Sequence, residues 1–265
     1  MLHRDDPNGF TVITQPAHAW VSGQLARAWG SRRFGTFYPY EEMCLAAEQH
    51  DIGWLEWERA PTLNLKTGRP HSFMDLPVPD HTTMWSSSGE LAKIQGRYSA
   101  LLISMHGSGL YERHDGSKDS PQDARLIQEY LKDAHAFEAA LLADLKRDNI
   151  YGTHYLSPEI IARNRRLIGV WDYLSLMVCM GLKEGQSRTI ERVPCAKGVA
   201  ALTLKSLGNE MVDYAISPWP FKTKLCQLQV DGRKLPGTFN DQEAMRAALK
   251  SAEWVTMTIV LQPGK

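Results

Sequence analysis

Apolar positions in the first two thirds of the chain recur every three or four residues, which is the spacing of an amphipathic helix. One helix is predicted from Pro16, a residue suited to a first helical turn, up to the helix breaker Gly30. A second helix is predicted from Glu41 to His50, because its acidic first turn lies at the positive end of the helix dipole. The same spacing predicts three longer helical stretches, at residues 89–111, 121–147 and 158–182.

After Gly185 the period changes to two, and apolar residues alternate with polar ones as they do in half-buried strands. The alternation is clearest at residues 201–204, 226–230 and 254–261, and one short amphipathic helix is predicted at 241–252. The segment 9–14 is predicted to be a further strand that can join this part. The pattern therefore predicts an α+β fold, in which a mainly α-helical domain at residues 16–185 precedes a small β-rich C-terminal part at residues 186–265.

Charge and composition exclude several classes of partner. The chain carries 30 Lys and Arg against 30 Asp and Glu, so no overall field attracts a polyanion and we expect no nucleic-acid partner. The longest apolar stretch, Leu167 to Leu182, is too short to span a bilayer and holds Asp172 near its centre, so we expect a buried helix and no membrane partner. The start of the chain lacks the pattern of a signal peptide, and the four cysteines lie in apolar segments without a Cys-x-x-Cys motif. Both features are typical of a cytoplasmic protein.

An adjacent histidine and aspartate at the predicted end of one helix point to metal binding. His50 and Asp51 can offer an imidazole nitrogen and a carboxylate oxygen to one ion, and Gly53 lets the chain bend away from that ion. A second carboxylate, Asp172, stands within an apolar helix, where burial costs several kcal/mol unless the charge is paired or bound to a metal. These residue types predict a site for a divalent cation.

The order of these residues resembles the HD superfamily of metal-dependent phosphohydrolases, which has a His on one helix, a His-Asp pair on the next and an Asp on a late helix. The matching residues are His18, His50, Asp51 and Asp172, and the sequences of segments 46–53 and 169–176 are similar to those of the family's motif helices. The resemblance implies that residues 16–185 form an HD-like metal-binding domain. The His-Asp-x-Gly-Trp form of the motif looks most like an uncharacterised bacterial family of unknown function.

Two further histidines extend the resemblance to members of the superfamily that bind two ions. His81 and His106 stand where such members carry two extra ligands, and Asp51 would then bridge the two ions. His81 can equally be a loop or helix-start histidine with no ligand role. His106, which lies in an apolar helix beside Gly107, is the stronger of the two candidates.

Two residues are candidates for substrate binding. Arg165 lies seven residues before Asp172, two helical turns along the same face, so its guanidinium can hold an anionic group, although it also fits a solvated arginine cluster. Trp54 follows the His-Asp motif closely enough to touch a substrate, and it stands where many HD relatives carry a basic residue.

The resemblance implies a metal-dependent hydrolase, a phosphohydrolase acting on a small phosphorylated or nucleotide-like molecule, with Asp51 and Asp172 as its catalytic carboxylates. The cofactor would be one or two divalent ions of Mn, Fe, Zn, Mg or Ni. One alternative is a diiron oxygenase on the same ligands, and another is a non-catalytic sensor that binds a metabolite or nucleotide. The sequence predicts a small-molecule partner and leaves the substrate and the oligomeric state open.

Overall fold

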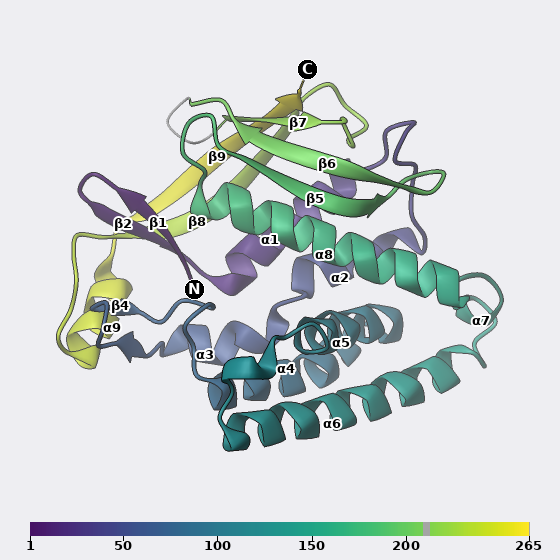
Figure 1. Cartoon of the computed structure of the whole chain (residues 1–265), viewed down its shortest axis with the longest axis horizontal. Coiled ribbons are helices and arrows are strands. Elements are labelled where there is room, and N and C mark those ends of the chain that lie inside the picture. Colours follow the sequence, from purple (N-terminus) through teal and green to yellow (C-terminus); the bar gives the residue numbers. More distant parts are fainter. Residues whose placement is uncertain (209–212, 265) are drawn as a thin grey trace.

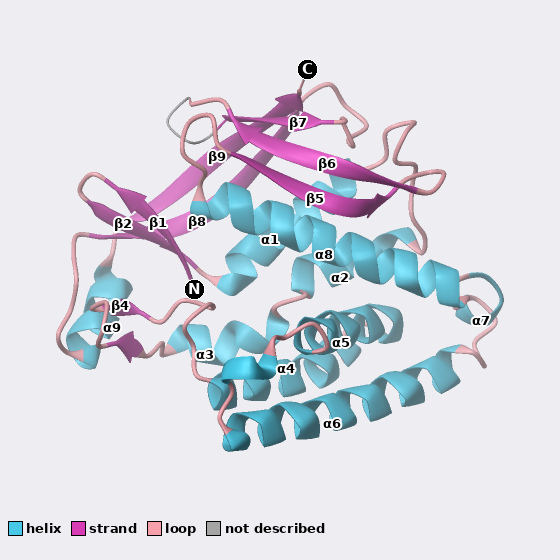
Figure 2. Ribbon diagram, viewed as in Figure 1, coloured by secondary structure: helices cyan, strands magenta, loops and turns pink. Residues whose placement is uncertain are grey.

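Helices form most of the lower part of the molecule and one curled sheet forms the upper part (Figures 1 and 2). The structure is a computed structural model that describes residues 1–208 and 213–264. The helices are α1 (Gln15–Ala28), α2 (Tyr40–Gln49), the 3₁₀ turn η1 (Ile52–Trp54), α3 (Leu55–Arg59), α4 (Val78–Lys93), α5 (Arg97–Tyr111), the 3₁₀ turn η2 (Gly116–Lys118), α6 (Pro121–Leu145), α7 (Tyr151–His154), α8 (Pro158–Met180) and α9 (Gln242–Ser251). The strands are β1 (Leu2–Asp6), β2 (Gly9–Ile13), β3 (Leu63–Asn64), β4 (Arg69–Pro70), β5 (Ser187–Pro194), β6 (Val199–Ser206), β7 (Asp213–Ser217), β8 (Cys226–Leu235) and β9 (Trp254–Pro263).

The main sheet has seven strands in the order β1-β2-β8-β9-β7-β6-β5. Neighbouring strands are antiparallel except for β7 and β9, which are parallel. The predicted strand at 9–14 is β2, and it joins the C-terminal strands by pairing Phe10 with Leu235 of β8. Both ends of the chain therefore contribute to one sheet.

The prediction of a mainly helical fold with a small β-rich C-terminal part is wrong. The chain is 49% helical and 22% strand, so the sheet is a major layer of the fold and not an appendage. The error came from strands that lack the alternating pattern: β1 has the polar sequence Leu-His-Arg-Asp-Asp, and β5 exposes five of its eight residues. The predicted helix at 89–111 is also two helices, α4 and α5, separated near Gly96. The division of the chain at residue 185 stays a prediction.

Local sequence signals begin and end the helices that carry the candidate site. The Thr14 side chain accepts a hydrogen bond from the Ala17 amide at the start of α1, and Ser157 caps α8 in the same way through the Ile160 amide. Helix α8 ends at Gly181, whose φ of 83° is the left-handed conformation that glycine adopts without strain.

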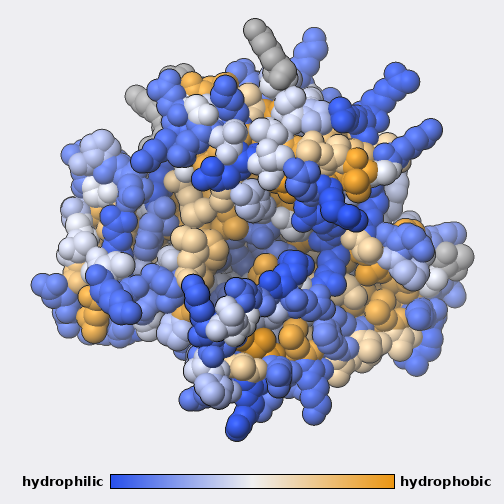
Figure 3. All heavy atoms as spheres, in the orientation of Figure 1, coloured by the Kyte–Doolittle hydropathy of each residue, from blue (hydrophilic) through white to orange (hydrophobic). Residues whose placement is uncertain are grey.

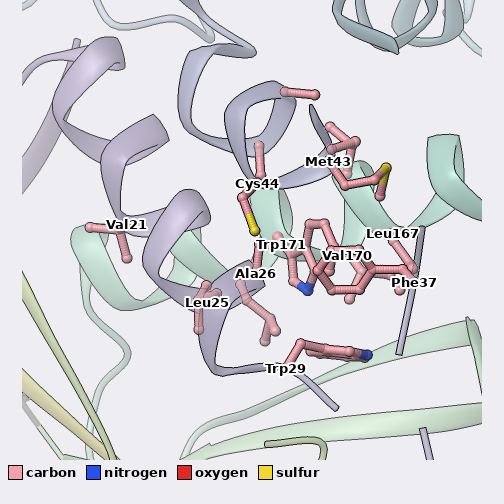
Figure 4. Packing of buried hydrophobic residues seen from close by; sticks show 14 of the residues in the cluster. Val21, Leu25, Ala26, Trp29, Phe37, Met43, Cys44, Leu167, Val170 and Trp171 are labelled. Carbon is pink, nitrogen blue, oxygen red and sulfur yellow. The ribbon is translucent and has the colours of Figure 1, made fainter. Parts of the chain in front are cut away.

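The largest core packs α1, α2 and α8 against one another beneath the sheet (Figure 4). Trp29 at the end of α1 and Trp171 of α8 are fully buried, with ring centroids 5.9 Å apart in an edge-to-face contact, and Phe37 packs on Trp171 at 4.9 Å. Helix α5 lies on the other side of α2 and α8, and α4 and α6 cover it from below (Figure 1). This packing fixes the relative positions of α1, α2, α5 and α8, which carry five of the six predicted ligands.

No helix in the described part of the chain is both long enough and apolar enough to cross a membrane. The four cysteines all lie within the described residues, where they are buried and unpaired, as their apolar sequence contexts predict.

Candidate metal centre

Five of the six predicted ligands lie together where four helices meet. His18 comes from α1, His50 and Asp51 from the end of α2, His106 from α5 and Asp172 from α8. Their ligand atoms form two groups, in each of which the atoms lie within 4.8 Å of one another: His18, His50 and Asp51, and His50, His106 and Asp172. His50 belongs to both groups and stands at the middle of the cluster.

The tautomer of His50 is set by the helix that carries it. Its Nδ1 donates a hydrogen bond to the Ala47 carbonyl, 2.8 Å away within the last turn of α2. Its Nε2 lies 3.5 Å from the Asp51 carboxylate and 3.4 Å from the Asp172 carboxylate. This nitrogen is buried and has no hydrogen-bond partner among the described residues. A buried ring nitrogen placed between two carboxylates, at distances too long for good hydrogen bonds, is the arrangement expected around a cation.

The hydrogen bonds around His18 lead to the same conclusion. Ser175 donates its hydroxyl proton to the Asp172 carbonyl at 2.7 Å and accepts from Ser22 at 2.9 Å. Because its only proton is already used, Ser175 accepts the bond from Nδ1 of His18, which lies 2.8 Å away. Nε2 of His18 then faces the Asp51 carboxylate at 2.7 Å. Two acceptors at that distance need a proton or a cation between them.

His106 and Asp172 complete the cluster on its α5 side. Nε2 of His106 lies 3.6 Å from the Asp172 carboxylate, and the rings of His50 and His106 are in edge-to-face contact with centroids 5.0 Å apart. The Asp172 side chain is 14% exposed, whereas those of His18, His50 and Asp51 are at most 3% exposed. The cluster therefore reaches solvent on the side of Asp172 and His106.

Electrostatics keeps most of these groups in the forms that bind metal. Burial opposes the ionisation of Asp51 and Asp172, but the neighbouring histidines outweigh it and hold the pKa of each carboxyl below its usual value. Burial lowers the pKa of His106 to about 4, so this imidazole is neutral at pH 7. Burial also disfavours charge on His50, yet Asp51 and Asp172 raise its pKa to about 9. A cation would take the place of the proton that His50 holds in the metal-free protein.

The donor set fits a divalent ion. Ligand atoms that bind one ion at 2.0–2.2 Å lie about 3.0–3.5 Å apart, close to the observed separations of 2.7–3.6 Å. Two carboxylates and neutral imidazoles carry a charge of about −2, which neutralises a divalent cation in a buried site.

The sequence profile of one protein family, described as a protein of unknown function (DUF3891), matches residues 1–237. The chain belongs to the DUF3891 family. All five clustered residues lie within the matched region. No curated protein and no protein of solved structure matches the chain.

The sixth predicted ligand of this DUF3891 chain, His81, lies beside the cluster but outside both groups. Its Nδ1 is 2.7 Å from the Tyr111 hydroxyl, and its Nε2 accepts a hydrogen bond from Trp85 at 3.2 Å. Both ring nitrogens are thus engaged. Trp54, predicted to touch substrate, is only 1% exposed and packs edge-on against His81 at 5.3 Å, so it forms part of the buried wall beside the centre.

Arg165 extends from α8 across to α5. Its Nε donates to the Met105 carbonyl at 2.9 Å, and one terminal nitrogen forms an ion pair with Glu112 at 2.5 Å. The hydrogen bond to the Met105 carbonyl places the guanidinium next to His106, near the solvent-exposed side of the candidate metal centre.

Sequence reasoning missed the residues that orient the ligands. Ser175 holds His18, and it lies three residues after Asp172, on the same face of α8. A small polar residue at that spacing inside an apolar helix was the signal that could have identified it. No sequence pattern marked the Ala47 carbonyl, because any residue at that position would supply the same oxygen.

Proposed function

We propose that this chain is a metal-dependent hydrolase that cleaves a small phosphorylated or nucleotide-like substrate. The observation that carries the proposal is the buried Nε2 of His50, which lies within 3.5 Å of two carboxylates and has no hydrogen-bond partner in the described part of the chain. The order of His18, His50, Asp51 and Asp172 along the chain supports it through its resemblance to the HD superfamily.

A divalent ion in this centre would supply Lewis acidity, which lowers the pKa of a bound water and polarises a substrate oxygen. The residues of the chain prepare for this role in distinct ways. Ala47 and Ser175 fix the tautomers of His50 and His18, so that the Nε2 atoms of both rings point toward the carboxylates. Asp172 is the most exposed ligand and stands where substrate and water would arrive. Its carboxylate is the candidate acceptor for a proton from the attacking water.

The ligand arrangement favours hydrolysis with one ion over oxygenase chemistry with two. A second ion needs ligands of its own, and both nitrogens of His81 are engaged with Tyr111 and Trp85. His50 is shared by the two ligand groups, which makes them overlapping parts of one centre.

Metal analysis combined with substitution tests the proposal. We expect the purified chain to contain about one divalent ion, and Asp172→Ala to lose it during dialysis against a mild chelator. The exposed His154 serves as the control, because His154→Ala should keep its metal. Hydrolysis of p-nitrophenyl phosphate, its bis ester and a panel of nucleotides should follow metal content. Full metal content in Asp172→Ala would disprove the assignment of Asp172 as a ligand. Iron-dependent consumption of oxygen would contradict the hydrolase and support the diiron oxygenase.

A further inference from the structure

A groove of about 430 Å³ runs between α5 and α8 and ends at the metal centre. Its size suits a small molecule. Of the five clustered residues, His106 alone lines the groove. The other lining residues that bear on its chemistry are Arg113, Arg165, Arg166 and Gly169. Hydrophilic side chains cover much of the face drawn in Figure 3, with smaller hydrophobic areas between them.

Two glycines leave room in and beside this groove. A Cβ atom on Gly169 of α8 would have no heavy atom within 4 Å, so the space next to it is open. Gly169 lies three residues before Asp172, which places this open space one helical turn from the centre. A Cβ atom on Gly109 of α5 would lie 2.5 Å from a terminal nitrogen of Arg165. Glycine at this position lets the guanidinium lie flat across α5, one turn beyond His106.

The charge of the groove is strongly one-sided. Its lining includes three arginines, Arg113, Arg165 and Arg166, and no acidic residue. The carboxylate of Glu112, outside the lining, neutralises Arg165. Arg166 donates only to the uncharged carbonyls of Glu191 and Arg192.

Arg113 is the arginine most available to a ligand. Its guanidinium forms no hydrogen bond or ion pair with the described residues, and one of its terminal nitrogens lies 3.2 Å from the position of a Cβ on Gly109. Burial, together with the positive charges of Arg113 and Arg192, lowers the pKa of Arg166. Cations that line one groove without an acidic residue among them form a receptor for an anion.

We propose that this groove binds an oxyanion of the substrate, a phosphate or carboxylate group, between Arg113 and Arg166. The inference rests on the proposed function, since it assigns to the substrate an anionic group that is held beside the metal centre. His50, Asp51 and Asp172 do not line the groove, so the arginines recognise this group without help from a metal ion. The substrate enters along α8, with its anionic group at Arg113 and its reacting bond toward His106 and Asp172.

Titration of the full-length chain with inorganic phosphate, after removal of metal with a chelator, tests this site on its own. Isothermal titration calorimetry should detect phosphate binding to the wild-type chain, and Arg113→Gln should weaken it by about tenfold or more, the loss expected for one charge-assisted contact. Arg125→Gln is the matched control, because Arg125 is an exposed arginine on α6 outside the groove. The same titration with glutarate determines whether carboxylates bind as phosphate does.

Gly169→Leu is a second, independent test. The leucine side chain would fill the open space beside residue 169 and abolish phosphate binding, while the metal content stays unchanged. Phosphate affinity within twofold of wild type in both Arg113→Gln and Gly169→Leu, or no phosphate binding at millimolar concentration, would overturn the proposal. Arginine-dependent phosphate binding in a chain that takes up no divalent metal when metal is supplied would retain the groove and reject the hydrolase. Metal-dependent hydrolysis with an unchanged KM in Arg113→Gln would reject the groove as a substrate site and retain the hydrolase.

Discussion

Gly53, two residues after the His-Asp pair, is the position where adding one methyl group has the clearest consequence. A Cβ atom there would lie 2.1 Å from the Met84 carbonyl oxygen and 2.2 Å from the Ser88 hydroxyl. Ordinary contact begins near 3.4 Å, so α4 would have to retreat by 1.3 Å, the difference between 3.4 and 2.1 Å. The atom in the way belongs to the helix backbone, so a change of side-chain rotamer cannot relieve the clash.

Overpacking of a buried site costs about 1–3 kcal/mol, and a clash with backbone belongs at the upper end of that range. We therefore expect Gly53→Ala to lower the free energy of unfolding by about 3 kcal/mol. The same displacement would move η1, and with it His50 and Asp51, so the affinity for metal should fall by about tenfold or more, as a shift of ligand orientation does. Urea denaturation followed by circular dichroism measures the first effect, and metal titration measures the second.

Gly169→Ala provides the control, because it makes the same chemical change in α8 near the same centre. Its Cβ would meet nothing within 4 Å, and alanine in a helix interior is favoured over glycine by about 1 kcal/mol. Gly169→Ala should therefore raise the free energy of unfolding, whereas Gly53→Ala lowers it. If Gly53→Ala unfolds within 0.5 kcal/mol of the wild type, the close approach of α4 to the His-Asp turn is not a real constraint.

Three further predictions concern the ligands. Ser175→Ala removes the acceptor for Nδ1 of His18, so metal affinity should fall by about tenfold to a hundredfold with the fold intact, as measured by competition with a chelating dye. In the metal-free protein the pKa of His50 is raised from 6.5 to about 9. The protonated ring therefore contributes its full stabilisation of the folded state below pH 6.5, and this contribution is lost as the pH rises through 9. Metal binding at pH 7.5 should accordingly release at least one proton, measured by calorimetry in two buffers of different ionisation enthalpy, and zero release would contradict a protonated His50. His106→Ala should lower metal affinity, whereas His81→Ala should leave the metal content near one ion per chain, and a fall from two ions to one in His81→Ala would show that a second ion exists.

The sequence predicted the helices better than the sheet, for a physical reason. Helices α1, α2, α6 and α8 each bury one face, and the resulting period is visible in any window of the chain. The sheet depends on pairing between distant segments, as where Phe10 of β2 faces Leu235 of β8. The edge strands β1 and β5 carry polar residues that no local pattern separates from loops.

The ligands of the candidate centre were recognisable because each residue is costly where it stands. Asp172 is a carboxylate in an apolar helix, and His50 with Asp51 ends another helix at a glycine-containing turn. The arginine groove was only partly predictable. Arg165 shares the face of Asp172 on one helix, but Arg113 reaches the groove from the turn that follows α5, and only tertiary packing brings that turn next to α8.

His81 shows what order along the chain cannot determine. Its position in the sequence agrees with the resemblance to two-ion relatives, and its ring does lie next to the His-Asp turn, in contact with Trp54. Whether an imidazole can bind an ion depends on a free lone pair, which is a property of its hydrogen-bond partners and not of its position in the chain. In this fold Tyr111 and Trp85 engage both nitrogens, and these partners come from α5 and from the next turn of α4. A second ion would have to displace the indole bond of Trp85, and burial, which lowers the pKa of His81 to about 4, already keeps the ring neutral without a metal. Nε2 of His50 differs from both nitrogens of His81 in this respect, because it is buried and has no hydrogen-bond partner among the described residues.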